Sequence, residues 1–260
     1  MNAPEAAGVT GLRVVVTGGL SGIGRSTVLA FQQAGARVGV LDVGDDLPPA
    51  GSMHRTADVR NRLQVAWALD ELASELGGLD VLVNNAGVSA VGCVADNSDE
   101  DWARVLDINV TGVARVSAAA LPHLRKSDAA AIVNLCSVAA LNGLPQRALY
   151  AASKGAVLSL TYAMATDHVH EGIRVNCVRP GTVSGPFVDQ MLKRFPDPAA
   201  ERRALDARQA TGRMVTPEEV AASIVYLSSR EARSITGTAL DVDGGMTHLR
   251  VRRDVQATRH

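Results

Sequence analysis

The sequence predicts an α/β fold, in which helices pack on both faces of a doubly wound, seven-stranded parallel sheet. Short apolar runs rich in β-branched residues alternate along the chain with longer helical stretches, an order typical of repeated β-α units. The composition agrees, because 47% of the residues are hydrophobic, 20% are charged and only 3% are aromatic. The plentiful Ala, Val and Gly suit helices that pack closely on a sheet.

We expect residues 1–260 to form one domain, because this length suits one large core and no linker interrupts the β-α order. The expected strands, in order, are residues 12–17, 37–41, 53–58, 79–83, 130–135, 173–178 and 239–242. The expected helices, in order, are residues 25–34, 61–76, 101–124, 149–170 and 216–229.

Several elements have local signals of their own. Apolar positions of the helix at 61–76 include Leu63, Trp67 and Leu72. Thr216, followed by proline and two glutamates, has the chemistry of a helix start. Residues 187–211 are charged and irregular, and we expect two short helices there that form a substrate lid. Residues 246–260 form a C-terminal tail rich in arginine.

A glycine-rich turn follows the first strand, in the run Thr17-Gly-Gly-Leu-Ser-Gly-Ile-Gly24. A strand that feeds such a turn into a helix binds the pyrophosphate of a dinucleotide in Rossmann-type folds. The first glycine permits the tight turn, the second lets the backbone approach the pyrophosphate, and the third lets the helix pack on the strand. The spacing G-x-x-x-G-x-G differs from the common G-x-G-x-x-G. The predicted cofactor-binding residues of this turn are Gly18, Ser21, Gly22, Ile23 and Gly24.

Asp42 ends the second strand, close to the distance at which a carboxylate binds the adenosine ribose. It can accept hydrogen bonds from the 2′- and 3′-hydroxyls, and it would repel a 2′-phosphate. No Arg or Lys follows it directly, since the next residues are Val43 and Gly44. The sequence therefore predicts NAD as the cofactor, in preference to NADP.

Tyr150 and Lys154 are four residues apart, so on a helix they lie on one face, one turn apart. A phenol is a poor base near neutral pH, because its unperturbed pKa is about 10. A cation one turn away favours the phenolate, which can take a proton from an alcohol or return one to a carbonyl. A Tyr-x-x-x-Lys pair is common by chance, and its meaning here depends on the motifs upstream.

Together these motifs resemble the short-chain dehydrogenase/reductase family in its single-domain form, over residues 12–245. The matching parts, in order, are the 17–24 turn, Asp58, Asn84-Asn-Ala-Gly87, Asn109, Ser137, Tyr150, Lys154 and Pro180-Gly181. The resemblance implies an oxidoreductase that transfers a hydride between NAD and a hydroxyl or carbonyl group of a small substrate.

The resemblance also implies roles for individual residues. Tyr150 would be the general acid/base, and Lys154 would lower its pKa and bind the nicotinamide ribose. Ser137 would hold the substrate oxygen, and Asn109 would support a water-linked proton path to Lys154. The other cofactor-binding residues implied are Asp58, Val59, Asn85, Ala86, Gly87, Pro180, Gly181 and Val183.

One position departs from the family pattern. A threonine commonly lies four residues after the glycine of Pro-Gly, where it binds the nicotinamide carboxamide. Here that position is Gly185. Thr182 and Ser184 are the two candidates for this bond.

Two arginines suggest the class of substrate. Arg147 lies three residues before Tyr150, and Arg208 lies in the lid segment. These positions resemble bacterial sugar-acid dehydrogenases of the 2-keto-3-deoxy-fuconate type and cytosolic type-2 hydroxybutyrate dehydrogenases. That resemblance implies that both arginines bind a substrate carboxylate, which a guanidinium holds by two bonds. The alternative is that one or both are surface ion-pair partners.

Two other functions stay open. The run Gly245-Met-Thr-His-Leu249 is closer to aldose 1-dehydrogenases of the L-fucose type, which would make a lactone from a neutral aldose. A non-catalytic dinucleotide-binding regulator could use the same fold. The intact set of Ser137, Tyr150 and Lys154 argues against the regulator.

The remaining features limit the partners. A net charge of −1 gives no general attraction to nucleic acid or to an anionic membrane, and no apolar run reaches membrane-spanning length. Neither the three cysteines nor the six histidines have metal-site spacing. The first ten residues lack the order of a signal peptide, so we expect a cytoplasmic protein. We also expect a homotetramer, because the family commonly pairs the helices that carry Asn109 and Tyr150, and both are rich in small residues.

Overall fold

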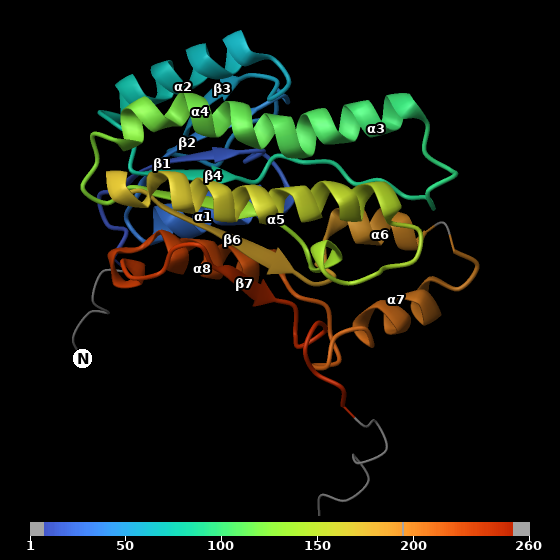
Figure 1. Ribbon diagram of the computed structural model, residues 1–260. Helices are drawn as coiled ribbons and strands as arrows, with labels where there is room; N and C mark the ends of the chain where they lie inside the picture. Colours follow the sequence, from blue (N-terminus) through green and yellow to red (C-terminus); the bar gives the residue numbers. More distant parts are fainter. Residues whose placement is uncertain (1–7, 194, 252–260) are drawn as a thin grey trace, which may run out of the picture.

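The computed structural model describes residues 8–193 and 195–251 and confirms the predicted seven-stranded parallel sheet (Figure 1). The strand order is β3-β2-β1-β4-β5-β6-β7, and every neighbouring pair is parallel. The strands are β1 (Arg13–Thr17), β2 (Arg37–Asp42), β3 (Met53–Thr56), β4 (Val81–Asn84), β5 (Ala131–Leu135), β6 (Arg174–Pro180) and β7 (Ala239–Val242). The winding reverses between β1 and β4, and ligands of open α/β sheets bind in the crevice at such a point.

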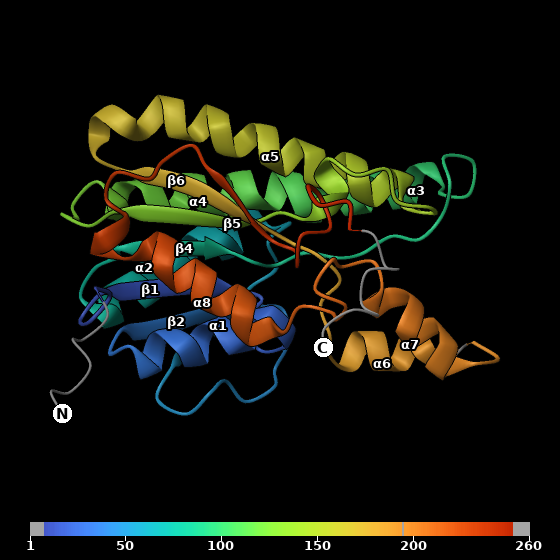
Figure 2. The same cartoon turned by 90° about the horizontal axis from the view of Figure 1, so that it is seen from below.

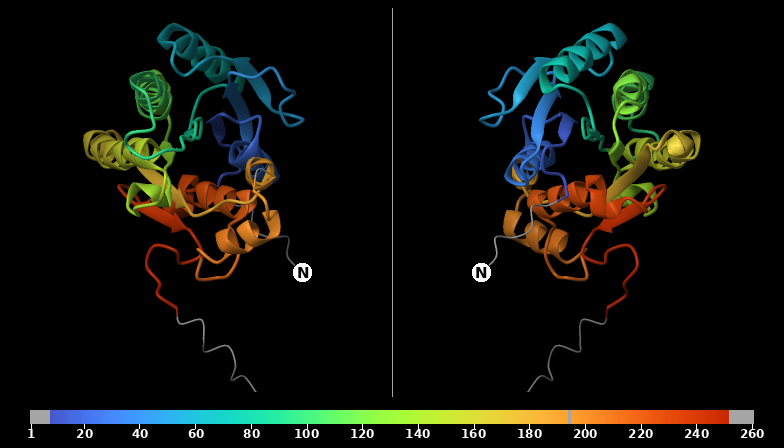
Figure 3. Two further views of the ribbon diagram at one scale, coloured as in Figure 1. Left: turned by 90° about the vertical axis from the view of Figure 1, so that its right-hand side faces the viewer. Right: turned by 90° about the vertical axis from the view of Figure 1, so that its left-hand side faces the viewer.

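Helices cover both faces of the sheet, as Figures 2 and 3 show from different sides. On one face lie α2 (Arg62–Leu76), α4 (Gly112–Leu124) and α5 (Ala148–His168), and on the other α1 (Gly22–Gln33) and α8 (Pro217–Ser228). Alternate strand residues divide between the two cores, because successive side chains of a strand point to opposite faces. Leu82 and Ile132 pack in the first core, and Val83 and Val133 pack in the second. Burial on both faces explains the continuous apolar runs of the sequence.

Two expectations about helices were wrong in detail. Helix α1 begins at Gly22, three residues before the expected start, after Ser21 in an extended conformation. On α2, Leu63 is 80% exposed and Trp67 is 54% exposed, so neither lies on the buried face. Leu72 lies on the buried face as expected, together with Val65, Ala68, Leu69, Ala73 and Leu76.

The long helix expected at 101–124 is interrupted. Helix α3 (Asp99–Leu106) passes into a single π-helical turn (η1, Asp107–Thr111), and α4 follows directly. A π turn inserts an extra residue into the helical spacing and often marks a functional site. Asn109 lies in this turn, and its side chain is buried.

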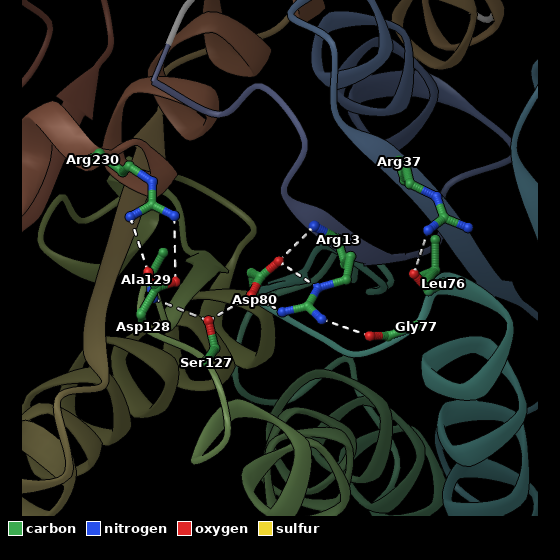
Figure 4. Close-up of polar contacts among 9 residues, drawn as sticks. All are labelled: Arg13, Arg37, Leu76, Gly77, Asp80, Ser127, Asp128, Ala129 and Arg230. Atoms are coloured by element: carbon green, nitrogen blue, oxygen red, sulfur yellow. Dashed lines mark hydrogen bonds and ion pairs between the residues drawn. The ribbon is translucent and has the colours of Figure 1, made fainter.

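A polar cluster ties together the amino end of the sheet (Figure 4). Arg13 at the start of β1 donates to both carboxylate oxygens of Asp80, from Nε at 2.7 Å and from Nη2 at 2.6 Å. Ser127, before β5, donates to the same carboxylate at 2.5 Å. Arg13 and Arg37 also donate to the carbonyls of Gly77 and Leu76, where they satisfy the last carbonyls of α2.

Two short helices lie beyond the carboxyl end of the sheet, as the sequence predicted (Figure 2). They are α6 (Pro186–Leu192) and α7 (Pro198–Asp206). A small core of Val188, Leu192, Leu205 and Met214 holds them together, separate from the cores of the sheet. The part of the predicted tail from 252 to 260 lies outside the described residues. Within the described ranges, no helix is both long enough and apolar enough to cross a membrane.

Candidate active site

Two adjoining cavities open at the carboxyl ends of the strands. The turn cavity, of about 560 Å³, is lined by the glycine turn, Asp42 and residues 57–60. The tyrosine cavity, of about 740 Å³, is lined by Ser137, Tyr150 and residues of α6 and α7. Both include Ile23, Asn85, Gly87, Val88 and Leu135, so they form one cleft at the point where the winding reverses.

The glycine turn has the shape that a diphosphate requires. Gly18 and Gly22 have positive φ values of 66° and 50°, which favour glycine. A Cβ on Gly24 would collide with the Gly18 carbonyl, whereas a Cβ on Gly22 would meet nothing within 4 Å. The Ser21 side chain does not cap α1, so its hydroxyl and the first N–H groups of the helix can serve an anion. Ser21 and residues 22–24 line the turn cavity, and the site therefore fits a dinucleotide.

Asn85 and Ala86 hold this turn from the end of β4. The Asn85 side-chain amide donates to the carbonyls of Thr17 and Gly18, both at 2.9 Å. In return, the Thr17 hydroxyl accepts from the backbone N–H groups of Asn85 and Ala86 at 3.0 Å. The Asn85 amide is thus engaged by the protein, where it fixes the glycine turn.

Asp42 faces the turn cavity with its carboxylate held by two backbone N–H groups. Oδ2 accepts from Leu20 and Oδ1 accepts from Gly44, both at 3.1 Å. These two hydrogen bonds fix the direction of the carboxylate.

Asp58 also lines the turn cavity, together with Val59, but its carboxylate has a partner that sequence reasoning missed. Arg60 approaches it at 2.6 Å, and this hydrogen bond is the main reason that the pKa of Asp58 lies below its ordinary value. Arg104 is a second cation in the lining, paired with Asp101 at 3.4 Å. The Asp58–Arg60 pair could have been predicted from the sequence, because the two residues are only two positions apart.

Ser137, Tyr150 and Lys154 meet in the tyrosine cavity. Lys154 Nζ lies 5.8 Å from the centre of the Tyr150 ring and donates to the Leu135 carbonyl at 2.7 Å. Lys154 is only 5% exposed and forms no salt bridge within the described ranges. Ser137 Oγ accepts from the backbone N–H of Ala139 at 3.1 Å, which leaves the hydroxyl proton to be donated elsewhere.

Asn109 is close to these residues but is fully engaged by the protein. Its Oδ1 accepts from the N–H of Val88 at 2.8 Å, and its Nδ2 donates to the Val88 carbonyl and to Ser153 Oγ. Ser153 in turn donates to the Tyr150 carbonyl at 2.8 Å. The π turn therefore joins the loop after β4 to the first turn of α5. Asn109 and Lys154 form no direct hydrogen bond, although a Cβ added to Gly87 would meet both side chains, Asn109 Oδ1 at 3.2 Å and Lys154 Nζ at 3.7 Å.

The two arginines singled out from the sequence both line the tyrosine cavity. Arg147 Nη1 donates to Ser89 Oγ at 2.9 Å and to the Ala90 carbonyl at 3.0 Å. Arg208 follows α7 and is exposed. No carboxylate of residues 8–193 or 195–251 forms a salt bridge with either, and no Asp or Glu lines this cavity. Neither Arg147 nor Arg208 is therefore part of an ion pair with a carboxylate of the described residues.

The loop after β6 distinguishes Thr182 from Ser184, the two candidates for the hydrogen bond to the nicotinamide carboxamide. Pro180, Gly181, Thr182 and Val183 line the tyrosine cavity, and Ser184 does not. The Ser184 hydroxyl donates to the Val215 carbonyl at 3.3 Å. Thr182 is thus the candidate that faces the cleft.

Sequence reasoning missed most of the apolar wall of this cavity. These residues are Val88, Val91, Val138, Leu144, Val188, Met191 and Leu205. They come from five separate loops and helices, and an apolar residue that lines a cavity has the same sequence signal as a core residue.

Comparisons with known proteins identify the family. Residues 17–247 match the family model described as enoyl-(acyl carrier protein) reductase. The chain is 38% identical to 2-(S)-hydroxypropyl-CoM dehydrogenase 3 of Xanthobacter autotrophicus, over 91% of this chain and 96% of that protein. It is 39% identical to meso-2,3-butanediol dehydrogenase of Serratia marcescens, over 90% of this chain and 94% of that protein.

A solved structure agrees with this result. The ligand-free aldohexose dehydrogenase of Thermoplasma acidophilum superposes with a TM-score of 0.88 at 33% identity, covering 94% of this chain and 96% of that one. Enzymes of this family use nicotinamide dinucleotides. The chain belongs to the short-chain dehydrogenase/reductase family and is an oxidoreductase that acts on hydroxyl groups.

Proposed function

We propose that this protein uses NAD to oxidise a hydroxyl group of a small anionic substrate, in the class of sugar acids and related hydroxy acids. The observation that carries the proposal is the tyrosine cavity, where two arginines without carboxylate partners lie beside Ser137, Tyr150 and Lys154.

The protein's own groups would manage the proton. Tyr150, whose ring lies beside the buried Lys154, would accept the proton of the substrate hydroxyl. Ser137 would donate its free hydroxyl proton to the substrate oxygen and hold it near Tyr150. When bound, the dinucleotide supplies the acceptor for the hydride.

Asp42 supports NAD rather than NADP. Its carboxylate is fixed by the N–H groups of Leu20 and Gly44 and faces the turn cavity, where the adenosine ribose would lie. A 2′-phosphate there would meet a negative charge that cannot turn away. Arg60 could attract such a phosphate, but Asp58 already neutralises it.

The charge of the tyrosine cavity supports an acid over a neutral aldose. An acid would offer the Arg147 and Arg208 guanidinium groups, which both line the cavity, a carboxylate partner that a neutral sugar lacks. The many hydroxyls of a neutral sugar would also face Val138, Leu144 and Met191, which cannot form hydrogen bonds. For the same reason, we expect these apolar residues to favour acids that carry few hydroxyl groups.

The test is a set of matched substrates, each acid beside its neutral analogue, with NADH absorbance as the readout. We expect the acids to have the higher kcat/KM. Arg147→Ala and Arg208→Ala should each raise KM for the acid by roughly 10- to 100-fold, as a lost charged hydrogen bond predicts.

The control is Arg202→Ala, which removes an exposed lid arginine that pairs with Asp189 and does not line the cavity. It should leave KM unchanged. Preference for a neutral aldose, with both cavity variants like wild type, would assign the arginines a structural role and favour lactone formation. Absence of NADH with every substrate would favour a non-catalytic regulator.

A further inference from the structure

Gln209 is a buried glutamine that joins the lid to the loop after β6. It is 2% exposed and lies in the turn that follows α7. Its Oε1 accepts from the backbone N–H of Thr182 at 3.2 Å. Its Nε2 donates to the Leu205 carbonyl, in the last turn of α7, at 2.7 Å. Both ends of one side-chain amide are thus satisfied by backbone groups from two different segments.

Both of these segments contribute to the tyrosine cavity. Leu205 and Arg208 line it from the lid, and Thr182 lines it from the loop. Thr182 is otherwise held through its carbonyl, which accepts from the N–H of Val215 at 2.9 Å. The Gln209 bond is therefore what fixes the N–H side of the Thr182 peptide, at the point where the chain turns toward Gly185.

The position of Gln209 is itself set by the lid. Asp206 Oδ1 accepts from the N–H of Met214 at 2.9 Å, and the N–H of Thr211 donates to the Gly244 carbonyl at 3.1 Å. An added Cβ on Gly244 would contact the Gln209 side chain at 3.1 Å, so the glutamine is closely packed there. Gln209 therefore connects the last turn of α7 directly to the backbone of Thr182.

We propose that Gln209 is a positioning residue that aligns Thr182 with the nicotinamide end of the cofactor according to the position of the lid. The proposal rests on the proposed function, since it takes Thr182 to face the nicotinamide. The proposal also explains how the protein can have Gly185 where the family commonly has a threonine. Thr182, three residues earlier, would bind the carboxamide instead, with its backbone fixed by Gln209.

The test compares two probes that differ only in the nicotinamide, NADH and ADP-ribose, by calorimetric titration of the full-length protein. Gln209→Leu removes both hydrogen bonds and keeps a similar volume. We expect it to weaken NADH binding by about tenfold, the loss expected for one hydrogen bond and its unsatisfied partner. ADP-ribose binding should change by less than about twofold, because the turn cavity is untouched.

Two further variants keep the result interpretable. Gln209→Met preserves the length of the side chain, and should behave like the leucine variant even if the latter folds poorly. Thr211→Ala, in the same turn, removes a hydroxyl whose bond stays within that turn and should leave both affinities unchanged. Equal weakening of NADH and ADP-ribose, or no weakening of either, would overturn the role of Gln209. Failure of the wild-type protein to bind NADH would instead reject the proposed function.

Discussion

At the scale of single residues, we expect the chemistry to depend on Tyr150, which lies beside the buried Lys154. Tyr150→Phe keeps the ring that lies 5.8 Å from Lys154 Nζ and removes only the proton-transfer group. We expect turnover to fall by roughly 10²- to 10⁴-fold, the usual contribution of general acid/base catalysis. NADH affinity, measured by titration, should stay at the wild-type value. Turnover close to wild type would assign the proton transfer to another group.

At the same scale, we expect Asp42 to govern the choice of cofactor. Asp42→Ala removes the carboxylate from the turn cavity, and we expect the preference for NAD over NADP in kcat/KM to shrink by roughly tenfold or more. Asp45→Ala is the matched control, because Asp45 is a nearby exposed acid that bonds to Thr56 and does not line the cavity. A wild-type enzyme that uses both cofactors equally well would contradict the assignment of Asp42.

At the scale of elements, the amino end of the sheet is sensitive to acid. Burial raises the pKa of Asp80, but hydrogen bonds from Arg13 and Ser127 lower it by more, so the pKa lies below its ordinary value. The carboxylate therefore stabilises the fold above the ordinary pKa of Asp, and this contribution is lost as the pH falls through the lowered value.

The variant Asp80→Asn tests this contribution. It should lower the unfolding free energy by about 2–4 kcal/mol at pH 7, because it leaves the Arg13 guanidinium without its anion. The difference in Tm from wild type should narrow as the pH falls below 4. If the difference in Tm between variant and wild type did not change with pH, the destabilisation would come from altered packing and not from the lost charge.

Elements with local signals were predictable from the sequence, and those set by distant contacts were not. Helix α8 starts where Thr216 indicated, because a capping box is made by residues three apart, and both of its hydrogen bonds form. The π turn at Asn109 had no such signal, since it is held by Val88 and Ser153, far away in the chain.

The same distinction applies to the candidate site. Motif residues such as Gly24 and Lys154 could be named in advance, because their chemistry permits few substitutes. The Gln209 bond and the apolar wall could not, since each depends on which loops the fold brings together.

At the scale of the whole molecule, we expect a homotetramer. The outer faces of α4 and α5 expose small residues, among them Ala114, Ala118, Ala152 and Ala163, which allow helices to approach closely across a two-fold axis. Light scattering should give the mass of four chains. Ala163→Arg should reduce that mass, whereas Ser74→Arg on the exposed face of α2 should not. A monomer mass at micromolar concentration would reject this assembly.

The separate core of α6 and α7 has a consequence for how such enzymes diversify. Because Val188, Leu192, Leu205 and Met214 pack on one another and not on the sheet, mutations there need not disturb the cores that hold the domain together. Selection could therefore remodel the specificity half of the cleft while the scaffold and the proton-transfer residues stay as they are. If Gln209 has the proposed role, its hydrogen bond to the Thr182 N–H limits this freedom, since a replacement for α6 and α7 must supply another partner for that group. Recombination between relatives should succeed most often when the junctions keep residues 182–209 together.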